Sequence, residues 1–120
     1  MESILKKIKM HIHQKEIVLL PYPFSNFEGM KVRPALVMSN DIFNQKSADC
    51  IMVPLTTILK DEPYSIVIDN KDMVSGTLVR QSRIRADKIF AVEKELVTLK
   101  IGVIKDKTFE KVKAQISKMF

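Results

Sequence analysis

The feature that most constrains the fold is a succession of short β-forming runs separated by turn residues. Apolar runs lie at about residues 16–24, 34–39, 50–57 and 64–69, and one or two more lie within 75–93. Pro, Gly, Asn, Asp or Ser lies at the end of most of these runs. Many short strands separated by turns are typical of a compact, mostly antiparallel barrel rather than of alternating βαβ units. We therefore predict a mostly β (α+β) fold.

Helices are predicted at both ends of the chain. Residues 2–13 place apolar side chains on one helical face, and residues 107–120 do the same with Phe109, Val112, Ile116 and Met119. Asp106 or Thr108 is the expected cap of the second helix. We predict an N-terminal amphipathic helix extension over residues 1–14 and a barrel domain over residues 15–120.

Composition narrows the class of protein. A chain of 120 residues, 46% hydrophobic and 28% charged, is long enough for one packed domain. The net charge of +6 favours a polyanionic partner, nucleic acid above all. The N-terminus holds no long apolar stretch, so we expect neither a signal peptide nor a membrane span, and a cytoplasmic protein.

Several kinds of chemistry lack their motifs. The sequence has no Walker A loop, G-x-G-x-x-G, H-E-x-x-H or G-x-S-x-G pattern. A single cysteine, Cys50, rules out an internal disulfide and a thiolate zinc site, and its apolar run predicts a buried, inert thiol. His11 and His13 are predicted to be solvated rather than a metal pair. We expect no cofactor and no metal, although a metal nuclease is unsupported rather than excluded.

Arg33 is the most unusual charged residue. It precedes Pro34 and an apolar strand, "RPALVMS", and the proline restricts Arg33 to extended backbone. A charge held in this way is either a structural ion-pair partner or part of a site.

A second group of polar residues lies in "SRIRADK", residues 82–88. In a strand, Arg83, Arg85 and Asp87 would share one face. Such a stripe is commonly a solvated face, but arginine also binds phosphate in a fork that a carboxylate can orient. If the stripe met Arg33 and Thr56, a phosphate-binding pocket would result.

Three blocks in register resemble the MazF/PemK (Kid) family of toxin endoribonucleases. They are "EIVLLPYPFSNFEGMKVRPALVMSNDIFN", "IMVPLTT" and "SRIRADKIFAVEKEL", and the resemblance covers about residues 15–118. The most specific element is R-P-A-L-V-x-S followed downstream by P-L-T. This chain departs from the family at Lys15-Glu16, where Gly-Asp or Gly-Glu is customary, and in its N-terminal extension.

The resemblance implies an SH3-like CcdB/PemK barrel, a homodimer and metal-independent cleavage of single-stranded RNA. Arg33 matches the catalytic arginine of the family, and Thr56 matches its catalytic threonine, with Thr57 as the alternative register. Glu28 matches an acid implicated in some members, and Arg85 with Asp87 matches the R-x-D pair of the Kid branch. Candidate RNA-binding residues are Phe27, Lys31, Ser82 and Arg83, while Tyr22 and Phe24 are equally plausible as core.

The chemistry expected from this set is attack by the substrate's own 2′-OH, which leaves 2′,3′-cyclic phosphate and 5′-OH ends. Arg33 would stabilise charge, Thr56 would bond a phosphoryl oxygen, and Asp87 or Glu28 would be the base, with Arg85 orienting it or serving as acid. The expected partner is a cognate acidic antitoxin. The alternatives are a CcdB-like toxin that binds a gyrase subunit and cuts nothing, or a basic nucleic-acid-binding module.

Overall fold

The computed structural model describes residues 10–21 and 31–120. Within these residues the elements are β1 (Glu16–Pro21), β2 (Val32–Val37), α2 (Asp41–Lys46), β3 (Asp49–Thr56), β4 (Ser65–Ile68), η1 (Asn70–Asp72), β5 (Met73–Gly76), β6 (Ser82–Arg85), β7 (Phe90–Glu93), η2 (Lys94–Leu96), β8 (Leu99–Ile104) and α3 (Asp106–Ser117). The predicted mostly-strand barrel architecture and the C-terminal helix are confirmed.

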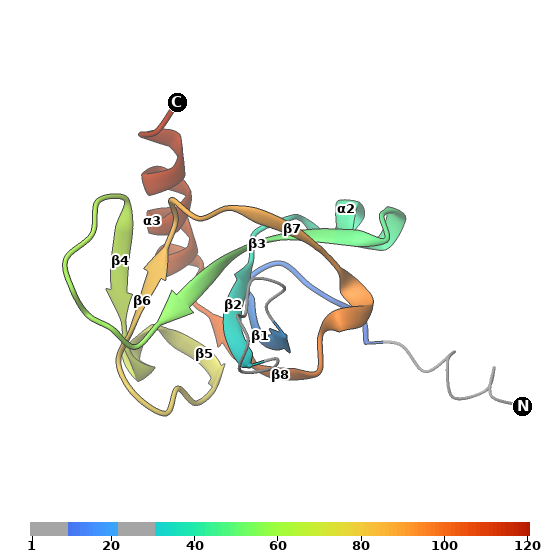
Figure 1. Ribbon diagram of the computed structural model, residues 1–120, viewed down its shortest axis with the longest axis horizontal. Helices are drawn as coiled ribbons and strands as arrows, with labels where there is room; N and C mark the ends of the chain where they lie inside the picture. The colour runs from blue at the N-terminus through green and yellow to red at the C-terminus, as the bar shows by residue number, and fades with distance from the viewer. Residues whose placement is uncertain (1–9, 22–30) are drawn as a thin grey trace, which may run out of the picture.

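The described strands form one curled antiparallel sheet of eight strands, in the order β4-β6-β3-β2-β1-β8-β5, with β7 also paired to β3 (Figure 1). The long strand β3 carries two partners on one side: its first half pairs with β7 and its last two residues pair with β6. Strand β2 lies on its other side. The end of β3 therefore lies between β2 and β6.

The three central strands are buried on both faces. Ile17, Leu36 and Val53 belong to one hydrophobic cluster, which also holds Phe109 of α3. Their neighbours along the strands, such as Val18 and Val37, belong to a second cluster on the other face. Alternate side chains of a strand point to opposite faces, so the continuous apolar runs in the sequence reflect two cores rather than one.

Strand β8 was not predicted from the sequence. Lys100 and Gly102 interrupt its apolar run, and its partners β1 and β5 are distant in the chain. Gly76 and Gly102 form a cross-strand pair, and a Cβ on Gly76 would lie 2.0 Å from the Ile101 carbonyl oxygen. Gly76, with φ of +79°, thus allows the two strands to approach closely.

The helix predicted over residues 2–13 is wrong at residues 10–13, which are not helical; residues 1–9 lie outside the described residues. Ile12 packs into the second cluster, and His13 begins a turn into β1. The turn is closed by the His13 N–H, which donates to Glu16 Oε1 at 2.7 Å, and Lys15 takes φ of +78°. A reversal of this kind before β1 is incompatible with a continuing helix.

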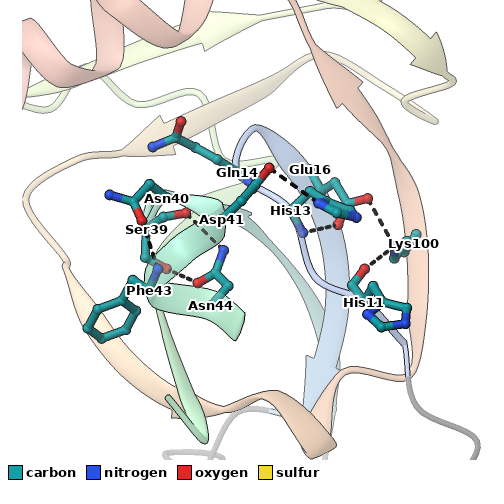
Figure 2. A network of polar contacts seen from close by, with 10 residues as sticks. All are labelled: His11, His13, Gln14, Glu16, Ser39, Asn40, Asp41, Phe43, Asn44 and Lys100. Carbon is teal, nitrogen blue, oxygen red and sulfur yellow. Dashed lines mark hydrogen bonds and ion pairs between the residues drawn. The ribbon is translucent and has the colours of Figure 1, made fainter. Parts of the chain in front are cut away.

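Polar contacts fix this N-terminal segment against α2 and β8 (Figure 2). The Gln14 N–H donates to Asp41 at 2.9 Å, and Lys100 contacts both Glu16, at 3.0 Å, and the His11 carbonyl. The buried Asn44 is satisfied by Ser39. The polar groups of this network bond to one another, and the network stabilises the fold.

Helix α3 packs beside β4 and buries Phe109 and Val112. Its predicted cap is wrong: Lys105 is the N-cap residue, without a side-chain bond. The Thr108 hydroxyl instead donates to Asp72 at 2.9 Å and ties the helix to η1. No helix in residues 10–21 and 31–120 has the length and apolar character needed to cross a bilayer.

Candidate active site

An open pocket of about 400 Å³ lies where β2, β3 and β6 meet. It is lined by Arg33, Pro54, Leu55, Thr56, Ile58, Lys60, Glu62, Arg85 and Lys88. Four of these residues are cationic and one, Glu62, is acidic. Such a balance suits a phosphodiester, whose charge arginine and lysine can neutralise.

Arg33 and Thr56 both line this pocket, from neighbouring strands. Strands β2 and β3 pair as far as Ala35 and Pro54, and Arg33 and Thr56 each lie two residues beyond that pair. Thr56 itself pairs with Arg83 across β3 and β6. Thr57 is exposed and does not line the pocket.

Arg85 and Asp87 form the strongest ion pair described at the pocket. Arg85 Nε and one terminal nitrogen donate to the two carboxylate oxygens of Asp87 at 2.9 and 2.8 Å. These hydrogen bonds lower the pKa of Asp87, and the same pair raises the pKa of Arg85. Asp87 lies in the turn after β6 rather than within the strand, and this turn returns its carboxylate to Arg85.

The lowered pKa of Asp87 implies acid-sensitive stability. A carboxyl group whose folded pKa is depressed stabilises the fold above its unfolded pKa, about 3.9, and this contribution disappears as pH falls through the folded pKa. We expect the melting temperature of the wild type to exceed that of Asp87→Asn at neutral pH, with the difference shrinking below about pH 4. Thermal unfolding across an acid pH series measures this. A difference that stays constant over the series would contradict the pairing.

Arg83 and Ser82 do not join the pocket as the sequence had suggested. Arg83 is 8% exposed and donates to Ser65 Oγ at 2.8 Å and to the Leu59 carbonyl at 3.2 Å, both of which flank or belong to the loop after β3. Ser82 is buried and donates to the Arg80 carbonyl. Through these bonds the loop 57–64 lies against this end of β6, and RNA binding by Ser82 and Arg83 stays a prediction.

Two predicted site residues, Glu28 and Phe27, lie outside the described residues, as do Tyr22 and Phe24. Lys31 is exposed immediately before β2, two residues from Arg33. Sequence reasoning missed three charged lining residues, Lys60, Glu62 and Lys88. For Lys60 and Glu62 the signal available was the charged run "KDEP", which begins four residues after Thr56.

The remaining reactive groups lie apart from the pocket lining. Cys50 is fully buried, and burial raises the pKa of its thiol to about 11, so the predicted inert thiol is confirmed. His13 lies 3.4 Å from Asp41 on the N-terminal side of the fold. In the part of the chain that the structure describes, no three or more His, Cys, Asp or Glu side chains gather in a way that could hold a metal ion.

The fold is a curled antiparallel half-barrel with a C-terminal helix and a basic pocket at a strand end. The sequence matches the family described as "PemK-like, MazF-like toxin of type II toxin-antitoxin system" over residues 13–120. The chain belongs to this family.

Solved structures agree at the level of the fold. An endoribonuclease from a Mycobacterial species superposes with a TM-score of 0.72 at 19% identity, covering 93% of each chain. A MazE–MazF crystal structure from Deinococcus radiodurans gives 0.74 at 16% identity, covering 92% of this chain and 96% of that one. A Mycobacterial endoribonuclease with its cognate antitoxin gives 0.69 at 20% identity, covering 89% and 92%. No curated protein matched the sequence.

Proposed function

We propose that this protein is a sequence-specific endoribonuclease toxin that cleaves single-stranded RNA without a metal ion. The observation that carries the proposal is the pocket that combines Arg33, Thr56 and Arg85 with two lysines. Membership of the PemK-like, MazF-like family supports it, and so do the folds shared with proteins named as endoribonucleases.

The proposed reaction uses the 2′-OH of the RNA as nucleophile. Its oxygen attacks the adjacent phosphorus, the bond to the 5′-oxygen breaks, and the products carry 2′,3′-cyclic phosphate and 5′-OH ends. Negative charge develops on the phosphoryl oxygens, and Arg33, exposed at the start of β2, is available to offset it. The Thr56 hydroxyl accepts from the Ile58 N–H at 3.1 Å, which leaves its own proton for a phosphoryl oxygen.

Arg85 has a different part in this proposal. Asp87 holds its guanidinium by two hydrogen bonds, so the fork is fixed in direction before substrate binds. A donor that is already held in one orientation loses little conformational entropy when it binds a phosphate. Asp87 is thus a positioning residue for Arg85 in the proposed reaction.

A cognate acidic antitoxin and a second copy of the chain are the proposed partners. Two of the similar folds were solved with MazE or a cognate antitoxin. A disordered acidic segment that folds onto a basic pocket would mimic RNA and exclude it, with affinity that weakens as salt rises. We propose the cytoplasm, where mRNA is found, as the site of action.

The decisive experiment is cleavage of a long single-stranded RNA in the presence of EDTA, with both new ends mapped. We expect cutting to persist in EDTA, because the pocket supplies its own positive charge. We expect the cuts to fall at a short recurring sequence. An oligonucleotide with deoxyribose at the scissile position should stay intact, since the nucleophile is missing.

Loss of cutting in EDTA that Mg²⁺ restores would contradict the metal-independent mechanism. Salt-dependent RNA binding without product would indicate a binding module, and gyrase binding without product would indicate the CcdB-like alternative.

A further inference from the structure

Glu62 is the one carboxylate among the described residues that line the pocket. Its side chain is 30% exposed, so a bound substrate can reach it while the protein holds it. Its ion pair with Arg85 is loose, with Glu62 Oε1 3.9 Å from a terminal nitrogen of the guanidinium. A carboxylate in this state keeps lone pairs free for a proton.

Asp87 is less suited to accept a proton. Both of its oxygens already accept short hydrogen bonds from Arg85, and those bonds lower the pKa of its carboxyl group. A carboxylate with a lowered pKa is a weaker base, and protonating it would break the fork. Asp87 is also absent from the pocket lining. The two acids near Arg85 therefore differ in what they can do.

Hydrogen bonds of the Ser65 and Arg83 side chains hold the loop that carries Glu62. The Ser65 hydroxyl donates to the Glu62 carbonyl oxygen at 2.5 Å, and Arg83 donates to that same hydroxyl at 2.8 Å. Arg83 also holds the Leu59 carbonyl at the other side of the loop. This buried arginine, which the sequence had suggested for RNA, thus anchors the segment that presents Glu62.

We infer that Glu62 is the general base that takes the proton from the 2′-OH in the proposed cleavage. This inference rests on the proposed function and assigns the proton acceptor within it.

The proposed step conserves protons and electron pairs. The 2′-OH proton passes to a Glu62 oxygen as O2′ bonds phosphorus, and the P–O5′ electron pair leaves on O5′. A pocket ammonium, Lys60 or Lys88, protonates O5′ and regains its proton from solvent, to which Glu62 releases its own. The step requires no oxidant, reductant or metal.

The test compares Glu62→Gln with Asp61→Asn, a neighbouring acid that is fully exposed and does not line the pocket. Asp61 lies 3.8 Å from Arg83, whose hydrogen bonds to Ser65 and Leu59 do not involve it. Both changes remove one negative charge, so a general electrostatic effect would move both. We expect Glu62→Gln to lower kcat by about 10²–10³, with KM little changed, because general base catalysis contributes at that scale. Asp61→Asn should cut as the wild type does.

Two further variants separate chemistry from folding. Glu62→Ala removes the side chain, and added formate should restore part of its kcat if a carboxylate in that space is the base. The same formate should do nothing for Glu62→Gln, whose amide fills the space. Glu62→Asp keeps a carboxylate and should retain intermediate kcat, with circular dichroism of all variants matching the wild type.

Several outcomes overturn the inference while leaving the proposed function standing. These are a Glu62→Gln kcat within about twofold of wild type, an effect on KM alone, or a loss that Glu28→Gln shows and Glu62→Gln does not. A wild-type protein that leaves every RNA intact would overturn the proposed function as well, and the two failures are thereby distinguished.

Discussion

Replacing Arg33 by alanine is expected to lower kcat for RNA cleavage by about 10²–10³, the usual cost of losing one preorganised donor to a developing oxyanion. Thr56→Ala should cost a similar factor. The fold should survive both, because Arg33 is exposed and Thr56 ends its strand with one bond to the Ile58 N–H. Single-turnover cleavage of a mapped RNA site, with melting temperatures beside it, measures both effects.

The chain offers a matched control for each change. Thr57→Ala removes the same hydroxyl one residue on, outside the pocket, and Arg80→Ala removes an exposed guanidinium that does not line it. Both should cut at close to the wild-type rate. If all four variants lost activity equally, the loss would reflect general charge or folding, and the assignment of Arg33 and Thr56 would be wrong.

Local sequence pattern was enough to place the part of the site that lies on strands. Arg33 is held extended by Pro34, and Thr56 follows an apolar run, so each was expected at a strand end. The pairing of β2 with β3 then brings both strand ends to the same pocket. The pairing of Arg85 with Asp87 follows from a spacing of two residues, although a turn rather than a strand completes it.

Placement of the loop between β3 and β4 could not be predicted in the same way. Residues 57–64 hold two adjacent acids, Asp61 and Glu62, and nothing local distinguishes the one that enters the pocket. The distinction comes from Ser65, which bonds the Glu62 carbonyl three positions away, and from Arg83, which bonds Ser65 across 18 positions. Burial of Arg83 could not be predicted for the same reason. The strand period determines on which face of the sheet its side chain lies, but not which loop covers that face.

Strand β8, which the sequence pattern did not predict, depends on long-range pairing in the same way. Its residues do alternate, with Lys100 and Gly102 between apolar side chains, but the run is short and its partner β1 begins more than eighty residues earlier. Only the pairing of β8 with β5 gives Gly102 its purpose, since its missing Cβ lets Gly76 approach. Long-range pairing of this kind leaves little trace in a local pattern.

Phe109→Ala is expected to lower the free energy of unfolding by about 3–5 kcal/mol, the usual cost of emptying a buried phenylalanine site. Phe109 is 2% exposed and packs in the cluster that also holds Ile84 and Ala86, the residues that alternate with Arg83, Arg85 and Asp87. The ammonium groups of Lys15 and Lys113 lie 5.8 and 5.9 Å from its ring centroid, so their contacts with the ring are lost too.

Phe120→Ala is the matched control, because the same side chain there is 96% exposed and its removal should change stability by no more than about 0.5 kcal/mol. Urea unfolding at one fixed protein concentration gives both values, and holding the concentration constant keeps any dimerisation from entering the comparison. Equal losses in the two variants would contradict the core that the structure assigns to α3. Cleavage per folded molecule should be nearly unchanged in Phe109→Ala, because α3 supplies no described group to the pocket lining.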